Sequence, residues 1–240
     1  MVQSLLTFSL VHSPFLGSSS WRPVGDVLDR NGMRSLTLDL SDALDAGGRF
    51  YESFGEVAAR QITARSILVA HSGAGALAPT ICRYANGFVL GVIFVDALLP
   101  HPGRSWFDTA PTPLAERIRR DARLGRAQPW PRWLPESVLA ELLPDRQMRD
   151  DLIAGASPIP LGFLEELAPE CPTPAVRYGC AYLQLSEAYG AEAEQARASG
   201  WAVERFDGHH LSGLTDPAGV ASGIIDLALG LARGAPPAAG

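Results

Sequence analysis

The 240-residue chain contains no lysine, so all 20 of its basic residues are arginines. Without an ammonium side chain it cannot be a Schiff-base enzyme, a pyridoxal phosphate enzyme or a Walker-type nucleotide-binding protein. It also lacks C-x-x-C, H-E-x-x-H and a G-x-G-x-x-G following a strand. These absences argue against zinc and dinucleotide sites, and we therefore expect no metal and no other cofactor.

Cysteine, excess positive charge and long apolar runs are also scarce. Cys82, Cys171 and Cys180 are an odd number without metal-ligand spacing, which predicts a reducing, cytoplasmic compartment without disulfides. A net charge of −6 with no basic run gives no support for nucleic-acid binding. Arg, Asp, Gly or Pro interrupts every apolar segment, so we expect no membrane partner. The sequence leaves the oligomeric state open.

One stretch, residues 66–75, joins an apolar run to a serine between small residues. Residues 67–70 read as a strand buried on both faces. A small-x-Ser-x-small turn follows, with Ala70 and Ala74 as the small residues around Ser72. This is a relaxed nucleophile elbow, which would expose Ser72 Oγ and aim the Gly73 N–H at a developing oxyanion. A plain turn or helix cap is the alternative interpretation of the same pentapeptide.

Strands and helices alternate along most of the chain. This order predicts an α/β fold with a doubly wound, mostly parallel sheet of about six strands and right-handed crossovers. The expected strands are 5–12, 35–40, 67–70, 88–96, 175–185 and 201–206; the expected helices are 21–30, 49–63, 76–84, 187–199 and 216–233.

The alternation breaks between residues 97 and 170, where no good strand is found. Proline-punctuated helical segments are expected instead at 114–124, 135–143, 145–154 and 161–167. We interpret 97–170 as a helical cap inserted after the fourth strand. Residues 1–96 and 171–233 would form the core, and 234–240 a disordered tail.

The sequence resembles the α/β-hydrolase superfamily over nearly its whole length. The features that carry this resemblance are a loop at His12-Ser13 similar to H-G, the elbow at Ser72, the cap, and G-H-H-L-S-G-L-T-D-P at 208–217. The strand after the elbow ends in V-D-A with a P-x-x-G turn, as in small soluble esterase-like members. The resemblance implies a small-molecule substrate, no cofactor and a Ser-His-acid triad.

The resemblance also indicates which histidine is the base. In the family this histidine is followed by an apolar residue and lies seven positions before the proline of the last helix. His210 fits, because Leu211 follows it and Pro217 is seven residues on. His209 stands where relatives often have a small residue. A serine hydroxyl needs such an imidazole to accept its proton.

Two carboxylates compete for the role of triad acid. The family usually has G-x-x-D after the strand before the last, and Q-L-S-E places Glu187 there. Asp96, at the end of the strand after the elbow, is the rival. Without a catalytic role, Glu187 would be a solvated residue in the first turn of a helix and Asp96 a carboxylate bonded to loop N–H groups. We favour Glu187 over Asp96.

The first loop departs from the family pattern at a functional position. The residue that usually gives the second oxyanion N–H is here Pro14, which has none. The Phe15 N–H or the Ser13 hydroxyl could substitute. Ser13, Leu16, Leu98 and Trp106 are the expected contacts of a largely apolar substrate under the cap.

Our first hypothesis is a serine hydrolase that cleaves a carboxylic ester, lactone or thioester of a largely apolar small molecule through an acyl-enzyme. The second is a non-hydrolytic lyase, cyclase or epimerase, as used in natural-product biosynthesis, with His210 as base. The third is a non-catalytic binder of a small ligand.

Overall fold

Six strands form one sheet in the computed structural model, which describes residues 6–170 and 179–234. Its order is β2-β1-β3-β4-β7-β8, and every neighbouring pair is parallel. The strands are β1 (Thr7–Val11), β2 (Arg34–Leu38), β3 (Ser66–His71), β4 (Val89–Val95), β7 (Cys180–Gln184) and β8 (Ala202–Arg205). The predicted α/β fold with a mostly parallel, doubly wound sheet is confirmed.

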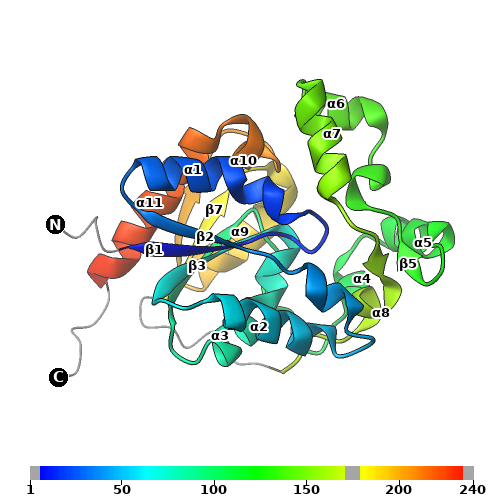
Figure 1. The fold of residues 1–240 in the computed structure, drawn as a ribbon, viewed down its shortest axis with the longest axis horizontal. Coiled ribbons are helices and arrows are strands. Elements are labelled where there is room, and N and C mark those ends of the chain that lie inside the picture. Colours follow the sequence, from blue (N-terminus) through cyan, green and yellow to red (C-terminus); the bar gives the residue numbers. More distant parts are fainter. Residues whose placement is uncertain (1–5, 171–178, 235–240) are drawn as a thin grey trace.

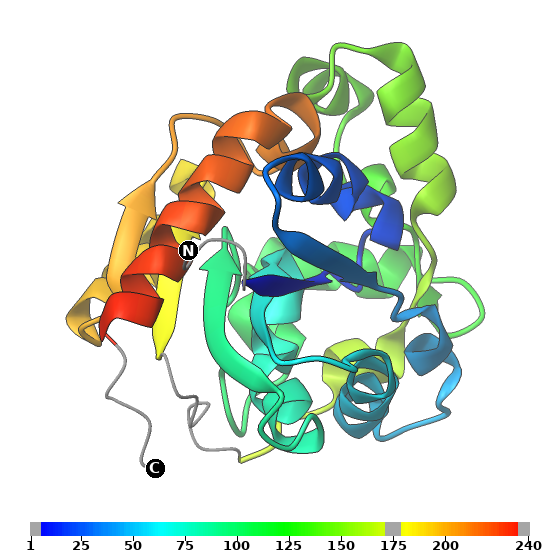
Figure 2. The same ribbon diagram turned by 60° about the vertical axis from the view of Figure 1, so that its left-hand side comes forward.

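Helices cover both faces of this sheet, as Figure 2 shows. One face packs against α1 (Arg22–Arg30) and α11 (Pro217–Gly234). The other packs against α2 (Phe50–Gln61), α3 (Ala78–Tyr84) and α9 (Gly190–Ala198). All six residues of β3 are buried, because the strand is central and covered on both sides, which explains its unbroken apolar pattern.

The interval between β4 and β7 forms the helical region expected there. It contains α4 (Trp106–Thr109), α5 (Thr112–Asp121), α6 (Glu136–Leu142), α7 (Arg146–Gly155) and α8 (Leu161–Glu165). Figure 1 shows α5, α6 and α7 projecting beyond the sheet. We expected no strand here, but β5 (Arg126–Ala127) and β6 (Ile159–Pro160) form an antiparallel pair. Two residues per strand are too few to produce a periodic signal.

The remaining elements are short. In the part of the chain that the structure describes, the 3-10 segments are η2 (Ser18–Trp21), η3 (Ser41–Asp45), η4 (Ser72–Leu77), η5 (Trp130–Trp133) and η6 (Glu187–Tyr189). The short helix α10 (Ser212–Thr215) precedes α11. Residues 175–178 of the expected fifth strand and residues 235–240 of the expected tail lie outside the described residues, whereas Gly234 ends α11. Across the described ranges, none of the helices combines the length and apolarity needed to cross a bilayer.

Candidate active site

The turn after β3 has the strained geometry of a nucleophile elbow. Ser72 has φ +57°, in the left-handed region that non-glycine residues rarely adopt. The loop after β4 holds the turn in place, because the Leu98 N–H donates to the Ser72 carbonyl oxygen at 3.0 Å. A Cβ added to Gly75 would lie 2.0 Å from the Leu98 carbonyl oxygen. Only glycine therefore fits at this position, and Leu98 lies against the elbow.

The loop between β8 and α10 brings His210 to the elbow. His210 Nε2 lies 3.1 Å from Ser72 Oγ. The neighbouring His209 instead accepts from the Leu211 N–H at Nδ1, 3.2 Å away, and its Nε2 lies 3.2 Å from the Thr215 hydroxyl. Of the two adjacent histidines, His210 is therefore the one in hydrogen-bond reach of the serine.

Asp96, directly after β4, holds the other side of the His210 ring. Its Oδ2 lies 2.8 Å from His210 Nδ1 and accepts from the Ser186 hydroxyl at 2.7 Å. Its Oδ1 accepts from the N–H groups of Leu185 and Ser186, each at 2.9 Å. The side chain is 0% exposed, so this is a fully hydrogen-bonded buried carboxylate.

These partners set the charge state of Asp96. Burial by itself would raise the pKa of this carboxyl, but the hydrogen bond and charge of His210 oppose it, followed by the bonds from Ser186 and Leu185. The net result is a pKa below the usual value. Tyr182 fixes the adjacent backbone, since its hydroxyl accepts from the Ala97 N–H at 2.9 Å and donates to the Ala97 carbonyl at 2.8 Å. Asp96 is therefore an ionised, rigidly oriented partner of His210.

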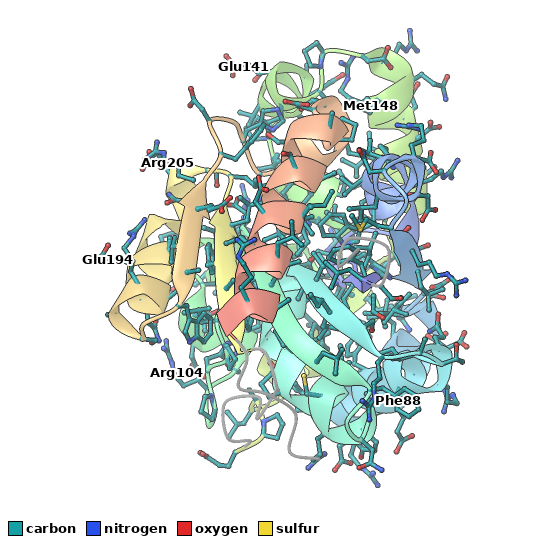
Figure 3. The ribbon with its side chains drawn as sticks, turned by 90° about the vertical axis from the view of Figure 1, so that its left-hand side faces the viewer. Phe88, Arg104, Glu141, Met148, Glu194 and Arg205 are labelled. Atoms are coloured by element: carbon teal, nitrogen blue, oxygen red, sulfur yellow. The ribbon has the colours of Figure 1, made fainter. Side chains whose placement is uncertain are left out.

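Glu187 does not lie beside His210, where the predicted acid would have to be, and the preference for it was therefore wrong. Its side chain is 76% exposed and forms an ion pair with Arg205. The ring nitrogens of His210 bond to Asp96 and Ser72 instead. Figure 3 shows Arg205 at the outer edge of the molecule. Asp96 Oδ1 accepts from the N–H groups of residues 185 and 186, and the side chain of the next residue, Glu187, lies in solvent.

The loop after β1 lies next to Gly73, on the side of the elbow facing β1. A Cβ added to Gly73 would lie 2.7 Å from the Phe15 ring and 3.3 Å from Ser13 Oγ. The Phe15 N–H donates to Ser13 Oγ at 3.3 Å, so Ser13 still has its own hydroxyl proton to give. Because Pro14 lacks an N–H, the donors near Gly73 are the Ser13 hydroxyl and the weakly bonded Phe15 N–H.

An aromatic cluster joins this loop to the cap. The Phe15 ring centroid lies 5.3 Å from that of Trp106 and 5.3 Å from that of Trp133, and Trp106 and Trp133 are 5.6 Å apart. Phe163 of α8 is 6.4 Å from Phe15. Trp106 therefore lies near the elbow, in apolar surroundings that it shares with Phe15, Trp133 and Phe163.

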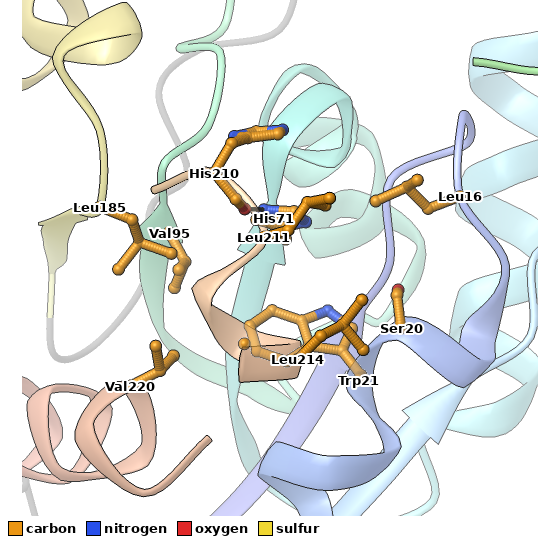
Figure 4. A pocket seen from close by; sticks show the side chains of 11 residues that line it. Leu16, Ser20, Trp21, His71, Val95, Leu185, His210, Leu211, Leu214 and Val220 are labelled. Carbon is orange, nitrogen blue, oxygen red and sulfur yellow. Dashed lines mark hydrogen bonds between the residues drawn. The ribbon is translucent and has the colours of Figure 1, made fainter. Parts of the chain in front are cut away.

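Leu16 lies elsewhere. It lines a cavity behind His210, together with Trp21, His71 and Leu214, as Figure 4 shows. The cavity has a volume of about 20 Å³. This is room for about one water molecule and far too little for an organic substrate. Leu16 therefore lines a small cavity beside His210 and belongs to the apolar cluster that contains Leu143 and Leu211.

Two aromatic residues that the sequence did not single out cover the His210 ring. His71 stacks on it with centroids 4.7 Å apart and an interplanar angle of 29°, and Tyr189 with 5.0 Å and 9°. Two stacked rings cannot share one face of an imidazole, so they cover opposite faces. His71 lies inside the elbow motif and Tyr189 two positions after Glu187. Their proximity to His210 depends on long-range packing, which leaves no periodic signal.

His71 is a neutral, fixed group. Burial, and secondly the charge of His210, lowers the pKa of His71 to about 3. Its Nε2 lies 3.0 Å from the His210 carbonyl oxygen. A carbonyl only accepts, so Nε2 carries the proton and donates to the His210 backbone. Within 6–170 and 179–234, no group of His, Cys, Asp and Glu side chains is arranged to hold a metal ion.

The sequence matches no family model and no curated protein, but its structure is similar to many solved ones. An extracellular α/β-hydrolase from a Paenibacillus species has a TM-score of 0.72 and 18% identity, covering 92% of this chain and 98% of its own. Tomato methylketone synthase I has a TM-score of 0.72 and 14% identity, and the match covers 94% of this chain and 98% of that one. A pyrethroid hydrolase from Sphingobium faniae has a TM-score of 0.67 and 20% identity, and the match covers 95% of this chain and 99% of that one. With its six-stranded parallel sheet flanked by helices, the chain has the α/β-hydrolase fold.

Proposed function

We propose that the chain is a serine hydrolase that cleaves a carboxylic ester, lactone or thioester of a largely apolar small molecule. The observation that carries this proposal is the continuous set of contacts from Ser72 Oγ to His210 Nε2, at 3.1 Å, and from His210 Nδ1 to Asp96 Oδ2, at 2.8 Å. This is the geometry of a nucleophile, a base and the acid that orients the base. Several solved structures with this fold are hydrolases or esterases by name.

The tautomer of His210 follows from its partners. Ionised Asp96 only accepts, so Nδ1 carries the ring proton and Nε2 offers a lone pair to the Ser72 hydroxyl. In the proposed reaction Ser72 Oγ attacks the acyl carbon while its proton passes to Nε2. Asp96 stabilises the resulting imidazolium and keeps it oriented.

Negative charge then develops on the carbonyl oxygen. The Gly73 N–H, directly after the nucleophile, is one donor in the proposed oxyanion hole. The Ser13 hydroxyl, close to Gly73, is the second donor that we propose; the Phe15 N–H, bonded to Ser13 Oγ, is the alternative. Collapse of the intermediate expels the leaving group, which takes the proton from His210. Water then attacks the acyl carbon while its proton passes to His210 Nε2. The bond from the acyl carbon to Ser72 Oγ breaks, and His210 returns the proton to Ser72 Oγ as the acid departs.

The aromatic cluster beside Gly73 supports an apolar acyl group. Phe15, Trp106 and Trp133 meet at centroid distances of 5.3 to 5.6 Å next to the elbow. An acyl chain that extends from the carbonyl carbon toward Gly73 would contact these rings. Burial of apolar surface is then the main source of substrate affinity.

The experiment is covalent labelling with a fluorophosphonate probe, mapped by mass spectrometry, alongside hydrolysis of p-nitrophenyl esters of increasing acyl length. We expect the adduct on Ser72, no adduct in Ser72→Ala, and a rate of labelling reduced at least about 1000-fold in His210→Ala. An unlabelled Ser72 in the folded wild-type protein would exclude the serine-hydrolase mechanism.

A non-hydrolytic reaction is the second candidate, favoured by Pro14, which replaces an oxyanion N–H. Tomato methylketone synthase I has a similar fold. In this case His210, oriented by Asp96, would remove a proton from a carbon next to a carbonyl and later return it. Exchange of such protons for deuterium in a ketone probe, lost in His210→Ala and kept in Ser72→Ala, would support this candidate over the first.

A further inference from the structure

Tyr189, the last residue of η6 after β7, reaches the nucleophile. Its hydroxyl oxygen lies 3.4 Å from Ser72 Oγ. Its ring is stacked nearly parallel on His210, with an interplanar angle of 9°. A single side chain thus contacts both the proposed nucleophile and the proposed base, and the mechanism above does not use it.

The direction of the Tyr189–Ser72 hydrogen bond follows from the other partners of Ser72. The Ser72 proton points to His210 Nε2, the only ring nitrogen with a free lone pair. Burial raises the pKa of Tyr189 above its usual value, although its bond to Ser72 opposes this. The phenol therefore keeps its proton, and Tyr189 O–H donates to Ser72 Oγ.

The order of the strands indicates on which side of Ser72 the Tyr189 side chain lies. β3 carries the elbow, with β1 on one side and β4 followed by β7 on the other. Ser13 and Phe15, at the proposed oxyanion hole, follow β1. Tyr189 follows β7 and stacks on His210, so it lies on the opposite side of Ser72, where the base returns its proton.

We propose that Tyr189 is a catalytic residue that donates a hydrogen bond to the leaving-group oxygen, next to His210. This role rests on the proposed hydrolase function. As the tetrahedral intermediate collapses, the bond from carbon to the leaving oxygen breaks and its electron pair stays on that oxygen. The oxygen takes the proton from His210 Nε2, while Tyr189 keeps its own proton and stabilises the developing charge. In deacylation the attacking water occupies the same place.

This role identifies a substrate class. A phenolate such as p-nitrophenolate leaves without help, whereas an alkoxide needs charge stabilisation and a proton. The second donor is therefore useful chiefly for esters of aliphatic alcohols. We infer that the natural substrates of this site are alkyl esters and not activated aryl esters or thioesters.

The test compares Tyr189→Phe with wild type on two esters of the same apolar acid, an ethyl ester and a p-nitrophenyl ester. Phenylalanine keeps the ring that stacks on His210 and removes only the hydroxyl. We expect kcat/KM for the ethyl ester to fall about 10- to 100-fold, the usual effect of one hydrogen bond to a charged group. For the p-nitrophenyl ester we expect a fall of less than about 3-fold.

Two further measurements make the result decisive. Across a series of substituted phenyl esters, the dependence of log kcat/KM on leaving-group pKa should be steeper in Tyr189→Phe than in wild type. Tyr84→Phe, which removes a hydroxyl on α3, is the matched control and should leave both esters and the slope unchanged. Equal losses on the two esters, or no loss on either, would overturn the role.

The result separates this proposal from the one on which it rests. Fluorophosphonate labelling of Ser72 in wild type and in Tyr189→Phe at similar rates, with no selective loss on the ethyl ester, would refute the role of Tyr189 alone. A folded wild-type protein without labelling or ester hydrolysis would refute the hydrolase function, and this role with it.

Discussion

Replacement of Asp96 by asparagine tests the central feature of the site. Asp96 accepts four hydrogen bonds: from the N–H groups of Leu185 and Ser186, from the Ser186 hydroxyl and from His210 Nδ1. An asparagine fits the same space. Its carbonyl oxygen would satisfy the two backbone N–H groups, and its NH₂ would then face His210.

The consequence is a change of tautomer. An amide NH₂ donates where the carboxylate accepted, so His210 Nδ1 must become an acceptor and the ring proton moves to Nε2. Nε2 then has no lone pair for the Ser72 proton. Loss of the correct tautomer in a serine triad costs on the order of 10⁴-fold in kcat, about 5.4 kcal/mol of transition-state free energy.

The assay is kcat/KM on a p-nitrophenyl ester, together with the second-order rate of fluorophosphonate labelling. Both should fall by roughly 10³- to 10⁴-fold in Asp96→Asn. The matched control is Glu187→Gln, which removes the charge of an exposed residue paired with Arg205 and should change either rate by less than about 2-fold. Less than a 10-fold loss in Asp96→Asn, or an equal loss in Glu187→Gln, would refute this assignment of the acid.

Three other predictions concern the elbow, the ring behind the base and the oxyanion hole. Gly75→Ala should reduce the free energy of unfolding by about 3 kcal/mol in urea titrations, because the new Cβ meets the Leu98 carbonyl oxygen at 2.0 Å; Gly230→Ala, with open space at its Cβ, should not be destabilised. His71 is buried with a pKa lowered to about 3, so the unfolded state binds its proton more tightly, and the wild type should lose stability as pH falls from about 6.5 toward 3. In His71→Phe that part of the pH dependence should be absent. If the free energy of unfolding falls equally with pH in both proteins across this range, His71 is not buried in its neutral form. Ser13→Ala should lower kcat about 10- to 100-fold with little change in KM, and an unchanged kcat would assign the second oxyanion donor to the Phe15 N–H instead.

Much of the fold could be predicted because its signals are local. The apolar run before Ser72 is continuous because β3 is buried on both faces, and the small residues around the serine are required by a sharp turn with φ +57°. The β5–β6 pair could not be predicted in the same way. Its two-residue strands depend on a contact between segments more than 30 residues apart.

The sequence by itself indicated the fold class through the alternation of strands and helices, and the elbow at Ser72 through its small residues. It indicated His210 through the resemblance to the α/β-hydrolase superfamily. Tertiary structure decided which carboxylate lies beside His210. Asp96 and Glu187 both follow strands of the same parallel sheet, β4 and β7, and thus reach the same edge. Only the path of residues 185 and 186, bound by Asp96 Oδ1, directs one carboxylate to His210 and the other to solvent.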